Sequence, residues 1–453
     1  MPYFTQKELG EESETLTLWM RMLAFVLESF RIRSFRFQWA ADAFASWAAE
    51  METLLLGWYV LVDTGSPFLV GLVGALRFVG TLLAPLYGVM ADRMDRRSLL
   101  IVLRLLHVVQ AGLIAALALT GLLAPWHAFA ISAAGGLLRM GENVARQSLI
   151  ADVVPPSALM NAVGLSRCTM DTAKIAGSIA AAWILSNLGM GTAFAAVTTF
   201  YLVSTALVLG VTVRERVVRN AESAYANLRS GVTYMRHNPT IMAIMALALL
   251  VNLTVFPLTN GLMPVVARDV FSGGPATLAL LLSATSVGAL AGSLLLSALP
   301  RLPRPERTMF VCIVLWHVLL LVFVRIEGIG GGVSALLTAV GIPDLALPLA
   351  VLAAYGAMTS GSMVTMSAVL LRTAEAEFRG RVMGVRMMAV YGLPMGLLLG
   401  GYLSERFGVL PALEVLGIVG LGLTVGAAFK WPELLRGPRG VPVALRSMSA
   451  AAP

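Results

Sequence analysis

Long apolar stretches follow one another along almost the whole chain, and this pattern limits the possible folds more than any other feature. Each stretch is long enough to cross about 30 Å of hydrocarbon as a helix. Water does not reach the backbone there, so only helices and closed β-barrels can span a bilayer, and these stretches lack the alternating pattern of barrel strands. The sequence therefore predicts an all-α membrane protein. Its twelve predicted transmembrane helices cover residues 35–63, 67–91, 98–122, 124–148, 159–187, 192–213, 240–265, 276–299, 308–325, 346–371, 381–403 and 409–430.

The composition excludes several other classes of protein. The chain is 58% hydrophobic and only 13% charged, which is too apolar for a water-soluble domain. The net charge of +8 would suit a nucleic-acid partner, but the basic residues fall in short connections between apolar stretches, so we expect no nucleic-acid binding. Cys168 and Cys312 lie inside apolar stretches and predict no disulfide. The polar residues 1–10 do not have the pattern of a cleavable signal peptide.

The basic residues predict the orientation in the membrane. Arginines are frequent between helices 2 and 3, 6 and 7, 8 and 9, and 10 and 11, whereas the first three connections on the opposite side have neither lysine nor arginine. Because Lys and Arg concentrate in cytoplasmic connections, both termini are predicted to be cytoplasmic. We expect a monomeric, multi-pass protein of the bacterial cytoplasmic (inner) membrane, surrounded by the lipid bilayer.

A weak internal repeat predicts two related halves. Asn161–Gly164 at the start of helix 5 corresponds to Arg381–Gly384 at the start of helix 11, about 220 residues later. The sequence thus predicts two pseudo-symmetric six-helix bundles, residues 35–213 and 240–430, joined by a basic cytoplasmic linker at 214–239. Such a duplication implies a substrate site between the bundles, near the middle of the membrane.

Two polar segments flank the bundles. Residues 1–34 form an N-terminal cytoplasmic segment in which charges recur every seven residues, a spacing that predicts an amphipathic helix lying in the membrane interface. Residues 431–453 are predicted to form a cytoplasmic tail.

A strongly charged connection separates helices 2 and 3. Gly88 permits close helix approach, Asp92 can lie at the positive N-terminus of a helix, and Arg93, Arg96 and Arg97 can face water and lipid headgroups. This Gly-x-x-x-Asp-Arg-x-x-Arg-Arg spacing resembles the signature loop of the major facilitator superfamily. The resemblance implies that this loop takes part in the conformational change of a transporter. The further residues that we assign to this network are Arg146, Asp152, Arg379 and Arg381.

Other segments resemble the branch of transmembrane secretion effectors that includes the enterobactin exporter and macrolide efflux pumps. They are Thr64-Gly-Ser-Pro67, Asn143–Gln147, Asp152–Pro155, Asn161-Ala162, Asn227–Gly231, Asn238-Pro239 and Phe378–Gly384. This resemblance implies proton-coupled export of a siderophore or another amphipathic small molecule. Gly177-Ser178 replaces the Gly-Pro of the antiporter signature, so import remains open as an alternative.

Charged side chains inside the predicted membrane region concentrate in the first bundle. Such groups are costly in hydrocarbon and normally face a partner or a wet cavity. On helix 1, Glu50 and Glu52 point to nearly opposite sides, and Glu50 shares its side with small and polar residues. We expect Glu50 to carry the coupling proton, with Asp42 and Glu52 as further candidates. The alternative is that Glu50 or Asp42 forms an ion pair with Arg77 or Arg139.

Helix 5 carries a second group of charges. Arg167, Asp171 and Lys174 follow one another at i, i+4 and i+7, within about 60° on one helix face. Asp171 can pair with either cation, which leaves one positive charge for an anionic, amphipathic substrate or for gating. A purely structural triad is the alternative. The remaining candidates for substrate binding or gating are Arg77, Arg139, Glu142, Asn252 and Asn260.

The second bundle carries few charges away from its helix ends, so we expect it to supply an apolar wall. On helix 4, an ion pair between Arg139 and Glu142 competes with a functional role for Arg139, and Arg146 is expected to pair with Asp92 or Asp152.

An enzyme is not expected. The chain has no phosphate-binding loop and no metalloprotease motif, and its four histidines lie far apart without neighbouring ligand residues, so we expect neither a metal nor another cofactor. A lysolipid flippase of the same fold remains an alternative to a transporter of soluble molecules.

Overall fold

The computed structural model describes residues 29–83, 87, 94–155, 158–212, 230, 232–298, 304–328, 345–375 and 378–436. The predicted N-terminal interfacial helix, most of the linker, and Gly88, Asp92 and Arg93 lie outside this part of the chain. So does most of the connection between the ninth and tenth predicted helices.

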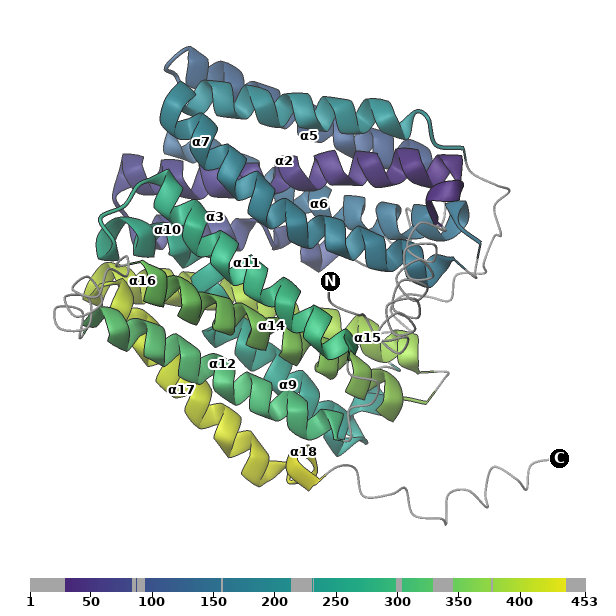
Figure 1. Ribbon diagram of the computed structural model, residues 1–453, viewed down its shortest axis with the longest axis vertical. Helices are drawn as coiled ribbons and strands as arrows, with labels where there is room; N and C mark the ends of the chain where they lie inside the picture. Colours follow the sequence, from purple (N-terminus) through teal and green to yellow (C-terminus); the bar gives the residue numbers. More distant parts are fainter. Residues whose placement is uncertain are drawn as a thin grey trace, which may run out of the picture.

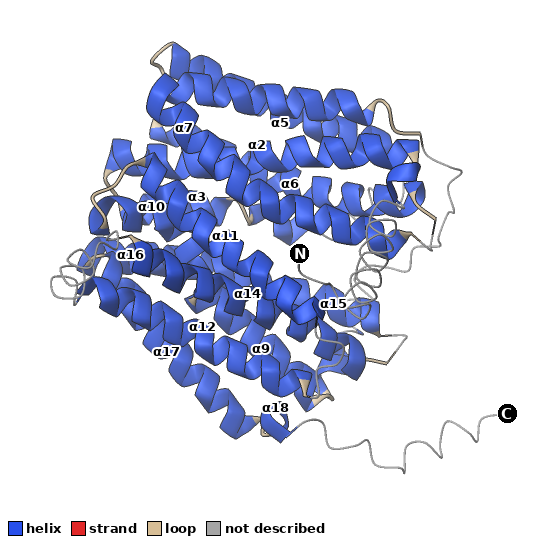
Figure 2. Cartoon of the chain, in the orientation of Figure 1, coloured by secondary structure: helices blue, strands red, loops and turns tan. Residues whose placement is uncertain are grey.

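Helices make up the described chain, which contains no strand (Figure 2). Eight of its helices are long and apolar enough to cross a membrane. The fold class predicted from the sequence is confirmed, and the arrangement is consistent with twelve spans.

The first half of the chain forms one bundle. Its elements are α2 (Arg33–Thr64), α3 (Pro67–Leu76), the 3₁₀ turn η2 (Val79–Leu83), α5 (Arg96–Leu119), α6 (Pro125–Val153) and α7 (Leu159–Val208). The long α7 bends back on itself at Gly189, whose φ of 81° is in the left-handed region that glycine tolerates. The predicted boundary between helices 5 and 6, at residues 187–192, lies at this bend.

The second half forms the other bundle (Figure 1). Its elements are α9 (Pro239–Thr254), the π turns η3 (Leu258–Leu262) and η4 (Val266–Val270) with α10 (Met263–Val265) between them, α11 (Pro275–Ala298), α12 (Pro305–Gly328), α14 (Ala346–Thr373), α15 (Arg379–Met388), η5 (Ala389–Tyr391), α16 (Gly392–Phe407), α17 (Val409–Lys430) and α18 (Glu433–Arg436). In Figure 1 the first bundle lies above and the second below, with α11 along the boundary.

Two of the predicted spans contain stretches that are not regular α-helix. Helix 2 stops at Leu76 and continues as a 3₁₀ turn, where its backbone packs directly on α6: a Cβ added to Gly136 would lie 2.6 Å from the Arg77 carbonyl oxygen. Helix 7 changes to π turns after Thr254, near Pro257 and Pro264, which lack the N–H that an α-helix needs. Residues Pro239–Val270 still form one apolar segment of membrane-spanning length. Both irregular stretches lie beside the cavity described below.

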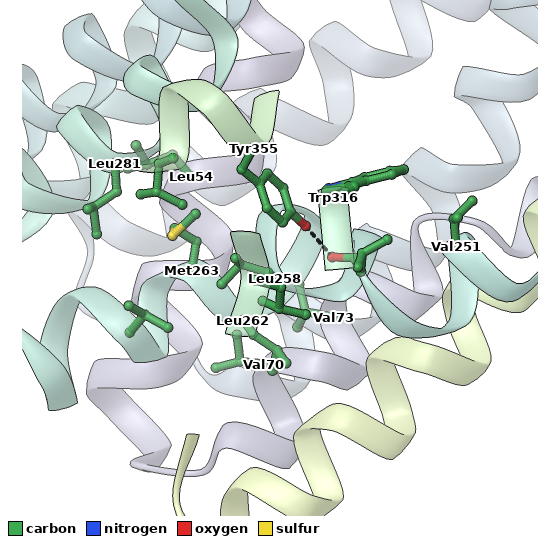
Figure 3. Close-up of a cluster of buried hydrophobic side chains, with 14 of the residues drawn as sticks. Leu54, Val70, Val73, Val251, Leu258, Leu262, Met263, Leu281, Trp316 and Tyr355 are labelled. Carbon is green, nitrogen blue, oxygen red and sulfur yellow. Dashed lines mark hydrogen bonds between the residues drawn. The ribbon is translucent and has the colours of Figure 1, made fainter. Parts of the chain in front are cut away.

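One buried apolar cluster joins the bundles (Figure 3). Leu54 and Val73 from the first bundle share it with Leu258 and Met263 from the second. The Tyr355 hydroxyl lies at its margin and donates to the Val255 carbonyl oxygen at 2.6 Å. The two halves therefore share an apolar interface.

Candidate functional site

A cavity lies between the two bundles. It contains about 970 Å³ of space free of protein atoms, part of it open to solvent. Its wall comes from α2, α7, η3, α11 and α14, together with Arg77 and Phe78 just after α3 and Phe256 just after α9. Transporter substrates bind between pseudo-symmetric halves near the midplane, so this is the candidate substrate site. A smaller, mostly apolar cavity of about 400 Å³ adjoins it and shares Arg77 and Asn260.

The first bundle supplies the charged side of this cavity. Glu50, Arg77, Asp171 and Lys174 all line it. Arg77 is the C-cap of α3, so the end of that helix carries its guanidinium to the junction of the two cavities. These four charged residues, which the sequence predicted on three separate helices, are thereby brought together at one cavity.

The second bundle supplies an uncharged but polar side. Thr259, Asn260, Thr285, Ser286 and Thr359 line the cavity beside Phe256 and Leu282. The expected apolar wall was therefore wrong, because serine and threonine fit inside helices by bonding to their own backbone: Thr285 donates to the Leu281 carbonyl oxygen at 3.0 Å. Asn252 does not line this cavity, and its amide donates to the Ala248 carbonyl oxygen.

The charges of α7 form the predicted triad. Asp171 lies 3.4 Å from the Arg167 Nε and 3.7 Å from the Lys174 Nζ, so its carboxylate pairs with both cations. Asp171 and Lys174 line the cavity, whereas Arg167 is 67% exposed and does not. The pairing is confirmed, and the triad keeps one positive charge in excess.

A second cavity of about 510 Å³ lies inside the first bundle, and Glu50 lines both it and the cavity between the bundles. Arg104 closes one side of this second cavity. Its guanidinium donates to Asp42 at 2.5 Å and to Glu142 at 3.0 Å, although the side chain is completely buried. Charge-assisted hydrogen bonds to two carboxylates offset the cost of burying this cation.

Glu52 belongs to the same buried network. Tyr201 donates to it at 3.1 Å, Gln110 donates at 3.4 Å, and the Arg139 guanidinium lies 4.0 Å away. His107 stacks on the Tyr201 ring and connects this group to Glu142, from which its Nε2 is 3.6 Å away.

The ion pairs differ from those considered from the sequence. Glu142 pairs with Arg104 rather than with Arg139, and Asp42 pairs with Arg104 rather than with Arg77 or Arg139. Arg104 was not predicted as part of the site because it lies within the third apolar stretch, residues 98–122. An arginine one helical turn before a histidine, at 104 and 107, was the available signal.

The predicted conformational loop is only partly described. Arg96 pairs with Asp152 at 2.6 Å, and the Arg97 guanidinium donates to the Leu209 carbonyl oxygen at 2.6 Å, at the C-terminus of α7. Arg146 donates to the side chains of Asn143 and Met170, and Asp152 pairs with Arg96 instead. Asp92, the other partner considered for Arg146, lies outside the described part of the chain, so the assignment of Arg146 to the loop network stays a prediction. The side chains of Arg379 and Arg381, like Gly88, Asp92 and Arg93, lie outside the described part.

Asp95 caps the N-terminus of α5 in this same connection. The hydroxyl and backbone N–H of Ser98 both donate to its carboxylate, at 2.6 and 2.9 Å. These hydrogen bonds lower the pKa of the Asp95 carboxyl below its ordinary value.

No group of three or more histidine, cysteine, aspartate or glutamate side chains is placed to hold a metal ion within the described residues. The site defined by this geometry is a charged, partly open chamber between two helical bundles, which is the arrangement of a membrane transporter.

Comparisons with known proteins agree with this class. The family model described as transmembrane secretion effector matches residues 25–435, and the chain belongs to this family of major facilitator superfamily transporters. It is 21% identical to the staphyloferrin A transporter of Staphylococcus aureus over 372 residues, which cover 82% of this chain and 89% of that protein. It is 20% identical to macrolide efflux protein A of Streptococcus pyogenes over 377 residues, with the same coverage.

Solved structures show the same fold. A bacterial homologue of the human lysosomal transporter Spinster, in an inward-facing and occupied conformation, superposes with a TM-score of 0.68 at 14% identity, covering 91% of this chain and 99% of that one. The nucleoside transporter NupG superposes with a TM-score of 0.64 at 15% identity, covering 89% of this chain and 100% of that one. The protein is thus a multi-pass membrane transporter that handles a small molecule, and not an enzyme.

Proposed function

We propose that the protein exports an amphipathic small molecule, such as a siderophore, by alternating access and in exchange for protons. The single observation that carries the proposal is the cavity between the bundles, whose wall combines ionisable side chains from one half with hydroxyl and amide groups from the other. Rocking of the two halves about this cavity would expose it to each side of the membrane in turn. The family and the macrolide efflux relative support export.

Glu50 is the proposed proton carrier. It lines both the cavity between the bundles and the one inside the first bundle, and no ion-pair partner lies within 4 Å of it in the described part of the chain. A carboxylate that is reached by water and lacks a direct counter-ion can take up and release a proton during the cycle. Asp42 pairs with Arg104, and Glu52 accepts hydrogen bonds from Tyr201 and Gln110. We therefore propose that these two carboxylates stabilise the site and do not carry the proton.

The spare positive charge beside the cavity is proposed to attract a negatively charged part of the substrate. Lys174 faces the cavity from the triad, and Arg77 faces it from the break in helix 2. Both termini are proposed to be cytoplasmic and the chain to lie in the inner membrane of a bacterium, an orientation that the basic connections support.

Flux measurements test this proposal. Purified protein in proteoliposomes is supplied with a labelled macrolide or a labelled siderophore, and transport is followed with and without a pH gradient. We expect wild-type flux to depend on the gradient. Glu50→Gln should lose gradient-driven flux but keep gradient-independent exchange, because the substrate site stays intact. Glu414→Gln is the matched control, since Glu414 pairs with Arg325 away from both cavities.

Three outcomes contradict the proposal. Full gradient-driven flux in Glu50→Gln removes that residue as the carrier. Uptake together with protons, rather than exchange, identifies an importer. Movement of lysolipid analogues alone, with neither soluble compound transported, identifies a flippase.

A further inference from the structure

The turn between α2 and α3 presents two helix ends of opposite polarity next to each other. Gly65 is the C-cap of α2, with a φ of 68°, and Ser66 is the N-cap of α3, with its hydroxyl accepting from the Leu69 N–H at 3.2 Å. Thr64 accepts from the Ser66 N–H, and Pro67 occupies the first turn of α3, where no N–H is needed. Carbonyl oxygens at the end of α2 and N–H groups at the start of α3 therefore lie side by side.

The second bundle supplies a charge of the appropriate sign to each helix end. The Glu405 carboxylate of α16 accepts from the Ser66 hydroxyl and, at 3.0 Å, from the Phe68 N–H at the positive end of α3. The Arg268 guanidinium of η4 donates to the Leu61 carbonyl oxygen at 2.9 Å, at the negative end of α2. Both contacts cross the boundary between the two bundles.

Close backbone packing lies directly behind these contacts. A Cβ added to Gly71 of α3 would lie 2.5 Å from the Leu397 carbonyl oxygen of α16, and one added to Gly401 would lie 3.0 Å from the Pro67 carbonyl oxygen. At these two glycines the backbones of α3 and α16 therefore approach each other directly. Figure 1 shows α3, α10 and α16 gathered there.

We propose that the Thr64-Gly65-Ser66-Pro67 turn, Glu405 and Arg268 form the outer gate of the transporter, with Glu405 and Arg268 as positioning residues that hold the outward side closed. The assignment of this end to the outside rests on the proposed function. Opening the cavity outward requires that both helix ends exchange their partners in the other bundle for water. Each of the four residues of this turn has a structural role in holding the two helix ends next to each other.

Distance measurements between the bundles test the gate without any substrate. Spin labels are placed at Leu122 and Phe407, which are both 67% exposed and lie on different bundles at this end, after Cys168 and Cys312 are replaced by serine. Double electron–electron resonance then gives the populations of closed and open states. A pair at Leu122 and Leu188, both on the first bundle, is the reference that should not change.

Glu405→Gln and Arg268→Gln should each raise the ratio of open to closed protein by roughly threefold to tenfold, since each removes a partly exposed, charge-assisted contact. Glu414→Gln is the matched control: it breaks the ion pair with Arg325, which lies within the second bundle. We expect its distance distribution to remain that of the wild type.

An unchanged distribution in Glu405→Gln and Arg268→Gln would overturn the gate, and so would an equal shift in Glu414→Gln. The outcome is independent of the flux assay. A shifted distance distribution in the gate variants, without flux in the wild type, would support the gate and count against the proposed export. Flux in the wild type, with an unchanged distance distribution in the gate variants, would support export and count against the gate.

Discussion

Arg104 offers the sharpest test of how this protein carries charge in its interior. The side chain is fully buried, and its guanidinium pairs with Asp42, which is 2% exposed, and with Glu142. Arg104→Met would leave the Asp42 and Glu142 carboxylates without the guanidinium that pairs with both. Removing one partner of a buried pair typically costs about 3–5 kcal/mol, and we expect a loss of unfolding free energy in this range.

A double-mutant cycle separates the ion pair from packing. Asp42→Asn alone should cost about 1–3 kcal/mol, because Arg104 keeps Glu142. The double variant should cost less than the sum of the two single variants by more than about 1 kcal/mol, since the unpaired carboxylate at position 42 is then gone. Unfolding in mixed micelles, followed by tryptophan fluorescence, gives the free energies. Arg167→Met is the control, because that arginine is 67% exposed and should contribute less than about 1 kcal/mol.

The reasoning would be refuted by a cost below about 1 kcal/mol for Arg104→Met, or by additive effects in the cycle. Either result would mean that water or lipid headgroups, rather than the guanidinium, compensate these carboxylates.

Three further changes give simple expectations. Gly136→Ala should destabilise by about 1–3 kcal/mol, because its methyl group meets backbone atoms of the neighbouring helix, whereas Gly164→Ala, with no atom within 4 Å of the added Cβ, should be neutral or stabilising by up to about 1 kcal/mol. Gly189→Ala should cost about 1–3 kcal/mol in the same unfolding assay, because its φ of 81° and ψ of 176° lie in a region that is essentially restricted to glycine. Asp95→Asn should reduce stability at neutral pH. Because hydrogen bonds from Ser98 lower the pKa of Asp95 in the folded protein, its contribution is complete above the unfolded value of about 4 and is lost as the pH falls through the folded value, so wild type and variant should converge in acid.

Several features follow from local sequence alone. The length of each apolar stretch is set by the thickness of the membrane, so the approximate bounds of the spans could be predicted from the chain. The predicted boundary between helices 5 and 6, at residues 187–192, contains the bend at Gly189 for the same reason. The spacing of Arg167, Asp171 and Lys174 determines that they share a helix face, and their pairing follows from this spacing.

Contacts between distant helices could not be predicted in this way. Arg104 meets Asp42 and Glu142 from two other helices, and no spacing within one helix indicates such a meeting. The break at Arg77 depends on the close approach of α6 at Gly136, which is a tertiary contact. Hydroxyl groups on the second bundle were overlooked because they are mildly polar and do not interrupt an apolar stretch.

The central claim is that the cavity between the bundles opens to each side of the membrane in turn. Thr259 lines that cavity, so Thr259→Cys in a protein whose native cysteines are replaced by serine reports its access to water. A membrane-impermeant maleimide is applied to inside-out and right-side-out vesicles. We predict labelling from both faces, faster from the cytoplasmic face, with Glu405→Gln increasing the rate from the outside. If the cysteine of Thr259→Cys is labelled from one face only, both with Glu405 present and in the Glu405→Gln variant, the account is contradicted.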